Sequence, residues 1–167
     1  MISVDPIRDE QKIQTMKSYL KGKNLRDHAL FVVGINIALR ITYLLALTWA
    51  DVVDENGKFK EIRILEGKTK KERRIQLNKP SQRALEELLG SLDDHSMDDY
   101  LFQSREGGQK PLSRQQALNI LRKPRVSSPE DFLYCANLLI FMFYCHKRYP
   151  YDFQNILVSF HRSILHN

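Results

Sequence analysis

Apolar residues in the first part of the chain recur at the three- and four-residue spacing of amphipathic helices. After Asp5-Pro6, this spacing predicts a first helix that ends near Gly22. Lys23-Asn24 forms a turn, and Asp27 is the expected cap of a second helix. A further helical piece is expected at about residues 42–47. The apolar positions of the second helix are Leu30, Val33, Ile37 and Leu39.

Two short segments after the turn signal Asp54-Glu55-Asn56-Gly57 predict a β-hairpin. The sequences EIRIL (61–65) and RRIQL (73–77) read as strands on either side of the cationic segment GKTKK (67–71). Two helices follow, one with Ser81 as its expected cap and one capped by Ser113. The sequence therefore predicts an α+β fold, with a mostly helical core and a small antiparallel sheet.

Two segments are apolar enough to raise the question of a membrane. Residues 30–49 contain Asn36 and Arg40 at their centre, where a charge in a bilayer costs about 2.5 kcal/mol or more. Residues 132–145 are shorter than the roughly 20 residues of a spanning helix. We expect the first segment to be protein interior, a membrane span at the second is a minor alternative, and no membrane partner is predicted.

The size and composition of the chain suit one globular domain. The 167 residues include 26 Lys and Arg against 20 Asp and Glu, a formal net charge of +6. The two cysteines, Cys135 and Cys145, lack the spacing of a zinc site, and the acidic start is unlike a signal peptide. A cytoplasmic protein without a metal centre is the expectation.

Much of the positive charge lies in the predicted hairpin. Residues 58–74 hold eight basic and three acidic side chains. Such a hairpin can bind phosphates, because extended basic side chains neutralise them and release counterions; a solvated surface turn is the alternative. The candidate DNA-binding residues are Lys70, Lys71, Arg73 and Arg74.

Arg40 lies between Leu39 and Ile41 in the most apolar part of the chain. A buried guanidinium needs a partner. It can form a structural ion pair or extend its head to the surface. Alternatively, it can hold a phosphate through two hydrogen bonds.

Three ordered blocks resemble the tyrosine recombinase (phage integrase) family. LRDHALFVVGINIALRITYLLALTWADV resembles the family's first arginine box, and EGKTKKERRIQL resembles its catalytic-lysine hairpin. DYLFQSREGGQKPLSRQQALNILRK looks like the segment that follows. The resemblance covers roughly residues 7–123 and implies the fold of the recombinase catalytic domain.

The resemblance implies site-specific DNA recombination or integration of a mobile element. In that reaction a tyrosine attacks a DNA phosphodiester and forms a 3′-phosphotyrosyl link. By analogy Arg40 clamps the scissile phosphate, and Lys68 protonates the departing 5′-oxygen. Double-stranded DNA and further recombinase protomers on it are the implied partners. The chemistry requires neither a metal nor another cofactor.

The sequence departs from the family in three places. Tyr43 stands where the family has a carboxylate after the arginine. No His-x-x-Arg box is found, and Tyr149 and Tyr151 follow His146 too closely to be the nucleophile, which stays unknown. The family's N-terminal DNA-clamping module is also missing from these residues. We therefore expect that this chain does not cleave DNA.

Composition changes at about Pro124. Residues 127–167 contain five Phe, four Tyr, three His and both Cys, with no clear period. We predict a partial catalytic domain at residues 1–124 and an atypical tail at residues 125–167, the product of a frameshift, an insertion or gene decay; a divergent C-terminus is the alternative. Two further functions stay open, a non-catalytic DNA-binding remnant and a protein-interaction module that uses the tail.

Overall fold

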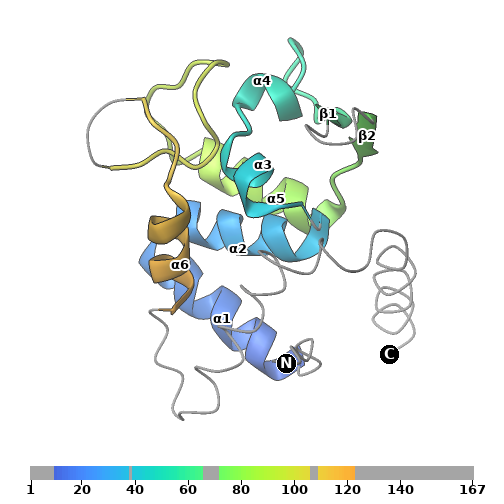
Figure 1. Ribbon diagram of the computed structural model, residues 1–167. Helices are drawn as coiled ribbons and strands as arrows, with labels where there is room; N and C mark the ends of the chain where they lie inside the picture. Colours follow the sequence, from blue (N-terminus) through green and yellow to red (C-terminus); the bar gives the residue numbers. More distant parts are fainter. Residues whose placement is uncertain (1–9, 38, 66–71, 106–108, 123–167) are drawn as a thin grey trace.

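The computed structural model describes residues 10–37, 39–65, 72–105 and 109–122. The predicted tail and the tip of the hairpin lie outside these residues. The fold of the described part is α+β, as predicted, because helices form most of it and the two strands form one small sheet (Figure 1). Its elements are α1 (Glu10–Lys23), α2 (Leu25–Ile37), α3 (Ile41–Leu45), α4 (Trp49–Val52), β1 (Ile62–Leu65), β2 (Glu72–Ile75), α5 (Lys79–Leu89) and α6 (Arg114–Arg122).

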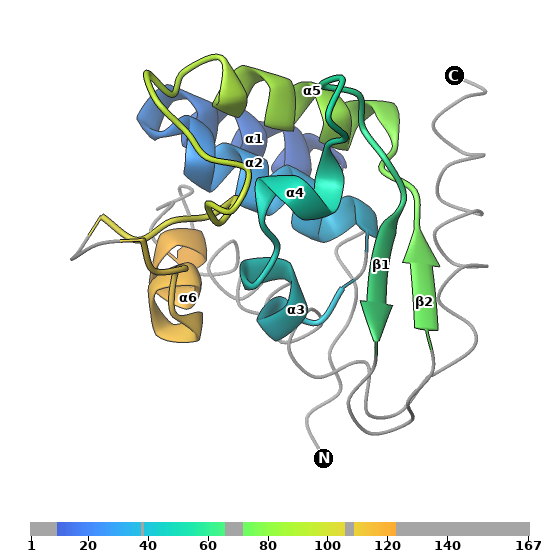
Figure 2. The same cartoon turned by 90° about the horizontal axis from the view of Figure 1, so that it is seen from above.

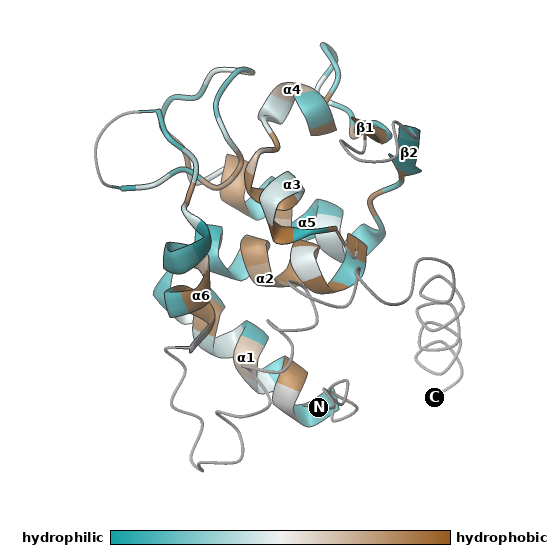
Figure 3. Ribbon diagram, in the orientation of Figure 1, coloured by the Kyte–Doolittle hydropathy of each residue, from teal (hydrophilic) through white to brown (hydrophobic). Residues whose placement is uncertain are grey.

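Helix α2 is the centre of the fold. Eight of its 13 residues are buried, from His28 to Ile37, so apolar side chains face its neighbours on several sides. Helices α1, α5 and α6 pack on α2, and Figure 2 shows α1 and α5 lying along it. Hydrophobic positions are concentrated on α2 in Figure 3. The apolar run containing Arg40 is therefore protein interior, and no helix in the described ranges is long and apolar enough to cross a bilayer.

Asparagines cap two of the helices, which corrects two of the three predicted caps. Oδ1 of Asn24 accepts hydrogen bonds from the backbone N–H of Arg26 (2.8 Å) and of Asp27 (3.4 Å), so α2 begins before Asp27. Oδ1 of Asn78 accepts from the backbone N–H of Ser81 at 3.1 Å. The cap of α5 is therefore Asn78, and Ser81 is a buried residue of the first turn. An asparagine three residues upstream can cap a helix as well as Asp or Ser can.

Ser113 caps α6, as the sequence predicts. Its Oγ accepts from the backbone N–H of Gln116 at 3.1 Å, and Oε1 of Gln116 accepts from the backbone N–H of Ser113 at 2.8 Å. This reciprocal pair is a capping box, which satisfies two backbone donors at the helix start. It directs Ala117 and Leu121 into the core, while Ile120 is half-buried.

The two predicted strands pair as an antiparallel hairpin, with bounds within two residues of those expected. In the register Ile62 faces Ile75, Arg63 faces Arg74, Ile64 faces Arg73 and Leu65 faces Glu72. The turn before β1 also forms as predicted, with Gly57 at a φ of 75°, a value that favours glycine. Asp54 stabilises that turn, because its Oδ1 accepts from the backbone N–H groups of Asn56 and Lys58.

Candidate functional site: an arginine junction and a basic hairpin

Arg40 occupies the junction between α2 and α3. It is the N-cap residue of α3, with φ −58° and ψ 137°, and its carbonyl accepts from the backbone N–H groups of Tyr43 (2.9 Å) and Leu44 (3.0 Å). Its neighbours Leu39 and Ile41 are only 3% and 2% exposed. The buried neighbours on both sides and the two hydrogen bonds hold the backbone of Arg40 in place.

The Arg40 side chain is half-buried. Among the described residues, no carboxylate lies within ion-pair distance of its guanidinium. The structural ion pair considered above therefore has no described partner. A guanidinium that pairs with no carboxylate of the described residues can direct its N–H donors to an external anion.

Tyr43, at the position where the family has a carboxylate, is half-buried and packs against the hydrophobic core. Thr42 is exposed. The side chain that replaces the family's acid therefore contributes apolar contact at this position. It brings no negative charge near Arg40.

The stem of the basic hairpin separates two of the predicted DNA-binding residues. Side chains alternate between the faces of a strand, and Arg73 pairs with the buried Ile64 while Arg74 pairs with the exposed Arg63. Arg73 is thus half-buried on the core face, and Arg74 is exposed on the opposite face. The described stem therefore presents these two arginines on opposite faces.

The outer face of the stem is close to electrically neutral. Glu72 lies 3.4 Å from Nη2 of Arg74 and 4.0 Å from Nε of Arg63, and Glu61 also lies 4.0 Å from Nε of Arg63. The two arginines are 65% and 56% exposed, and exposed pairs of this kind contribute roughly 0 to 1 kcal/mol each. Two carboxylates therefore offset the two arginines that face outward from the described stem.

A pair of amides joins the arginine junction to the hairpin. Nδ2 of Asn78 donates to Oδ1 of Asn36 at 2.6 Å, and Nδ2 of Asn36 donates to the carbonyl of Val32 at 2.7 Å. Asn36 lies four residues before Arg40 in the sequence, and Asn78 follows β2 by three residues. Sequence reasoning missed this pair. The available signals were a polar residue inside an apolar helix and an asparagine before Lys79-Pro80.

Several predicted site residues lie outside the described residues. Lys68, Lys70 and Lys71 belong to the tip of the hairpin. Tyr149 and Tyr151, which the sequence analysis rejects as nucleophiles, also lie outside the described ranges. Within the described ranges, no group of three His, Cys, Asp or Glu side chains is arranged to hold a metal ion. The described part of the site therefore consists of Arg40, the hairpin stem and the amide pair that links them.

Comparison with known proteins gives three matches. Residues 8–129 match the model of the phage integrase family. The chain is similar to the probable integrase/recombinase YoeC of Bacillus subtilis (strain 168), with 40% identity over 120 residues, 72% of this chain and 62% of that protein. The fold resembles a structure of the Tn1549 transposon integrase (residues 82–397) in complex with circular intermediate DNA, with a TM-score of 0.50 and 16% identity. That likeness covers 83% of this chain and 53% of the integrase chain, so this chain spans little more than half of either relative.

Proposed function

Because this chain belongs to the phage integrase family of tyrosine recombinases, we propose that it binds double-stranded DNA as part of a site-specific recombination or integration system. The observation that carries the proposal is the half-buried Arg40 guanidinium, which no described carboxylate neutralises. The hairpin supplies further positive charge, and the solved neighbour is an integrase bound to DNA. The family resemblance and the charge arrangement thus support the same ligand, a DNA phosphate.

The proposed roles follow from the charge that develops during phosphoryl transfer. Negative charge accumulates on the phosphoryl oxygens, so cations fixed in advance are the main source of catalytic stabilisation. We assign Arg40 to the non-bridging oxygens of the scissile phosphate. We assign Lys68 to the departing 5′-oxygen, where it would donate a proton.

Cleavage of DNA requires a nucleophile, whereas binding does not. None of the five histidines in the 167 residues begins a His-x-x-Arg sequence. Without an activated tyrosine the phosphotyrosyl intermediate cannot form, because covalent catalysis requires the attacking group itself. We propose that this polypeptide on its own binds a phosphodiester without breaking it.

The domain boundary and the cellular setting are part of the same proposal. Residues 1–124 would form the DNA-contacting part of a catalytic domain, and residues 125–167 a separate tail. Other recombinase protomers on the same DNA would be protein partners, and the cytoplasm would give access to that DNA. The family match supports the first of these assignments, because it covers residues 8–129.

A binding assay with matched variants tests the DNA contact. Fluorescence anisotropy with a labelled duplex should show that Arg40→Ala and Lys68→Ala each weaken binding by about tenfold, the loss expected for a charge-assisted hydrogen bond. Lys79→Ala, which removes an exposed charge at the start of α5, is the control and should stay within about twofold. Equal effects of all three variants would show that net charge alone determines binding.

A second assay tests for cleavage. The chain is incubated with a nicked duplex whose cleavage product cannot be religated, and covalent adducts are sought on a denaturing gel. We expect DNA binding in the first assay and no adduct in the second. An adduct that disappears after substitution of one tyrosine would identify a nucleophile and overturn the proposal of binding without cleavage.

A further inference from the structure

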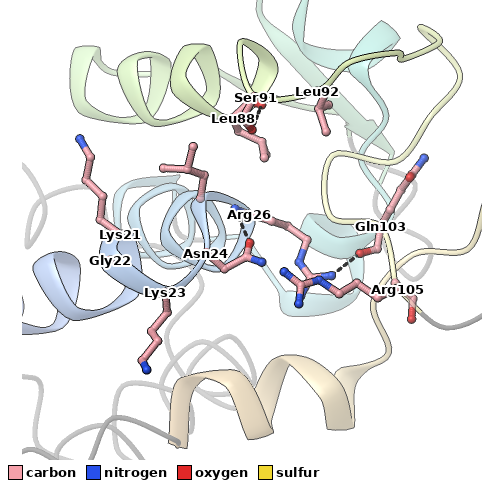
Figure 4. A pocket seen from close by; sticks show the side chains of 12 residues that line it. Lys21, Gly22, Lys23, Asn24, Arg26, Leu88, Ser91, Leu92, Gln103 and Arg105 are labelled. Atoms are coloured by element: carbon pink, nitrogen blue, oxygen red, sulfur yellow. Dashed lines mark hydrogen bonds between the residues drawn. The ribbon is translucent and has the colours of Figure 1, made fainter.

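A cavity of about 530 Å³ lies where α1 ends and α2 begins (Figure 4). Lys23, Asn24 and Arg26 form one side of it, and Leu88 and Leu92 at the end of α5 form another. Residues 103–105 line a third side of this open cavity, and the carbonyl of Gln103 accepts a hydrogen bond from Nη1 of Arg26. Its volume is in the range of small-ligand sites.

Positive charge exceeds negative charge around this cavity. Lys21 is balanced by Glu87 at 2.8 Å, and Arg26 is balanced by Asp27 at 2.7 Å. Two further lining cations, Lys23 and Arg105, are exposed and form no ion pair with any described carboxylate. The ammonium of Lys23 lies over the ring of Tyr19, 5.9 Å from its centroid, a weak contact that leaves its charge unneutralised. None of the described lining residues is Asp or Glu.

The cavity also offers more hydrogen-bond donors than acceptors. Arg26 directs Nε and Nη2 to Oδ1 of Asp27 and Nη1 to the carbonyl of Gln103, which leaves two of its five N–H groups. In Figure 4 the side chains of Arg26 and Arg105 extend toward one another at one end of the cavity. Oδ1 of Asn24 is already used by the backbone of α2, so its amide NH₂ remains as a donor. A ligand rich in acceptor oxygens matches this lining.

We propose that this cavity binds a phosphate group. Arg105 and Lys23 would supply the charge, and the remaining N–H groups of Arg26 would supply fixed hydrogen bonds. Leu88 and the 39%-exposed Leu92 would contact an adjoining apolar part, such as the sugar and base of a nucleotide. The site is separate from Arg40, because the 13 residues of α2 place the two at opposite ends of a helix about 20 Å long.

The experiment uses the full chain labelled with ¹⁵N and two probes, inorganic phosphate and adenosine monophosphate, at constant ionic strength. Saturable shifts of the backbone amides at residues 23–27 and 103–105 are expected. The double variant Lys23→Gln/Arg105→Gln should lose affinity by about tenfold or more, since both charges are removed. Lys79→Gln/Arg83→Gln, elsewhere on α5, is the matched control with the same change in net charge and should bind like the wild type. All four substituted side chains are exposed, so the fold should remain intact.

A duplex-binding arm distinguishes the two sources of phosphate. If the double variant weakens the binding of both phosphate and duplex, a DNA backbone phosphate occupies the cavity. If it weakens only the binding of the small probes, the ligand is a free phosphate ester. The proposal is overturned if the small probes cause no saturable shift at these amides, or if the control variant loses as much affinity. A loss of duplex binding without phosphate binding also overturns it, because long-range charge then explains the effect.

Discussion

The amide of Asn78 donates a 2.6 Å hydrogen bond to Oδ1 of Asn36, across 42 residues of sequence. The same Asn78 caps α5 through its own Oδ1, while Asn36 also bonds to the carbonyl of Val32. One short network therefore holds the C-terminal turn of α2 against the segment that follows the hairpin. Arg40 follows Asn36 in the sequence and the hairpin precedes Asn78, so the network connects the segments that carry both.

Removal of Asn36 should cost stability through the partner it leaves behind. In Asn36→Ala the half-buried amide of Asn78 loses its acceptor, and we expect a loss of about 1 to 3 kcal/mol in the free energy of unfolding by urea. Asn119→Ala is the control, because it removes an exposed amide pair with Gln115 on α6 and should change stability by less than about 0.5 kcal/mol. Similar losses in the free energy of unfolding for both variants would show that the Asn36–Asn78 hydrogen bond stabilises the fold no more than an exposed amide pair does.

The two candidate caps of α5 make opposite predictions. Asn78→Ala removes the hydrogen bond from the N–H of Ser81 and also the bond to Oδ1 of Asn36, and should cost about 2 kcal/mol or more. Ser81→Ala should be neutral or slightly stabilising, because its buried Oγ has no hydrogen-bond partner in the described structure. Thermal unfolding of both variants measures the difference. A destabilised Ser81→Ala with an unaffected Asn78→Ala would restore the cap predicted from sequence.

His28 should make stability depend on pH below neutrality. Burial lowers the pKa of this histidine in the folded chain, and nearby Lys21 and Lys17 lower it further, against an opposing effect of Glu87. The unfolded chain therefore binds a proton more readily, so stability falls as the pH drops below the ordinary histidine value of about 6.5. Urea denaturation across this range should give a shallower pH dependence for His28→Gln than for the wild type. Parallel curves would refute the assignment.

Glu72 should weaken the attraction of the hairpin for DNA. It lies close to both Arg63 and Arg74, so Glu72→Gln removes the carboxylate that both arginines share. We expect duplex affinity to rise about two- to fivefold at low salt and the gain to shrink as salt screens the charges. Glu86→Gln, an exposed position on α5, provides the matched control with the same change in net charge. An equal gain in duplex affinity for Glu86→Gln would mean that net charge, and not the position of the carboxylate, determines the effect.

The parts of the fold that were predictable from the sequence have local causes. The strands followed from apolar alternation, and Ser113 was identified as a cap from its place before an apolar helix. The four-residue helix α4 was missed. Its start has a local signal, because Asp51 accepts hydrogen bonds from the backbone N–H and the hydroxyl of Thr48, but it also depends on backbone bonds from Trp49 and Ala50 to the carbonyls of Asp99 and Met97. No pattern within a short window contains such a contact.

The candidate site likewise has parts with local causes, which the sequence predicts, and parts that depend on distant contacts. The position of Arg40 in an apolar junction was readable from the sequence, as was the hairpin that follows it. The bond between Asn36 and Asn78 was not, because it requires knowledge of how α2 packs against α5. The opposite orientations of Arg73 and Arg74 follow directly from strand alternation. The alternation of side chains along a strand therefore predicts opposite faces for these two arginines, which their charge alone does not.

The pairing of β1 with β2 also limits how the gene can change. Deletion or insertion of a single codon within β2 would exchange the two faces of the strand, turning Arg74 toward the core and Ile75 toward water. Substitutions on the outward face leave the pairing intact. Mutational drift in this strand is therefore expected to proceed by replacement of residues, and changes of length should be eliminated by selection for folding.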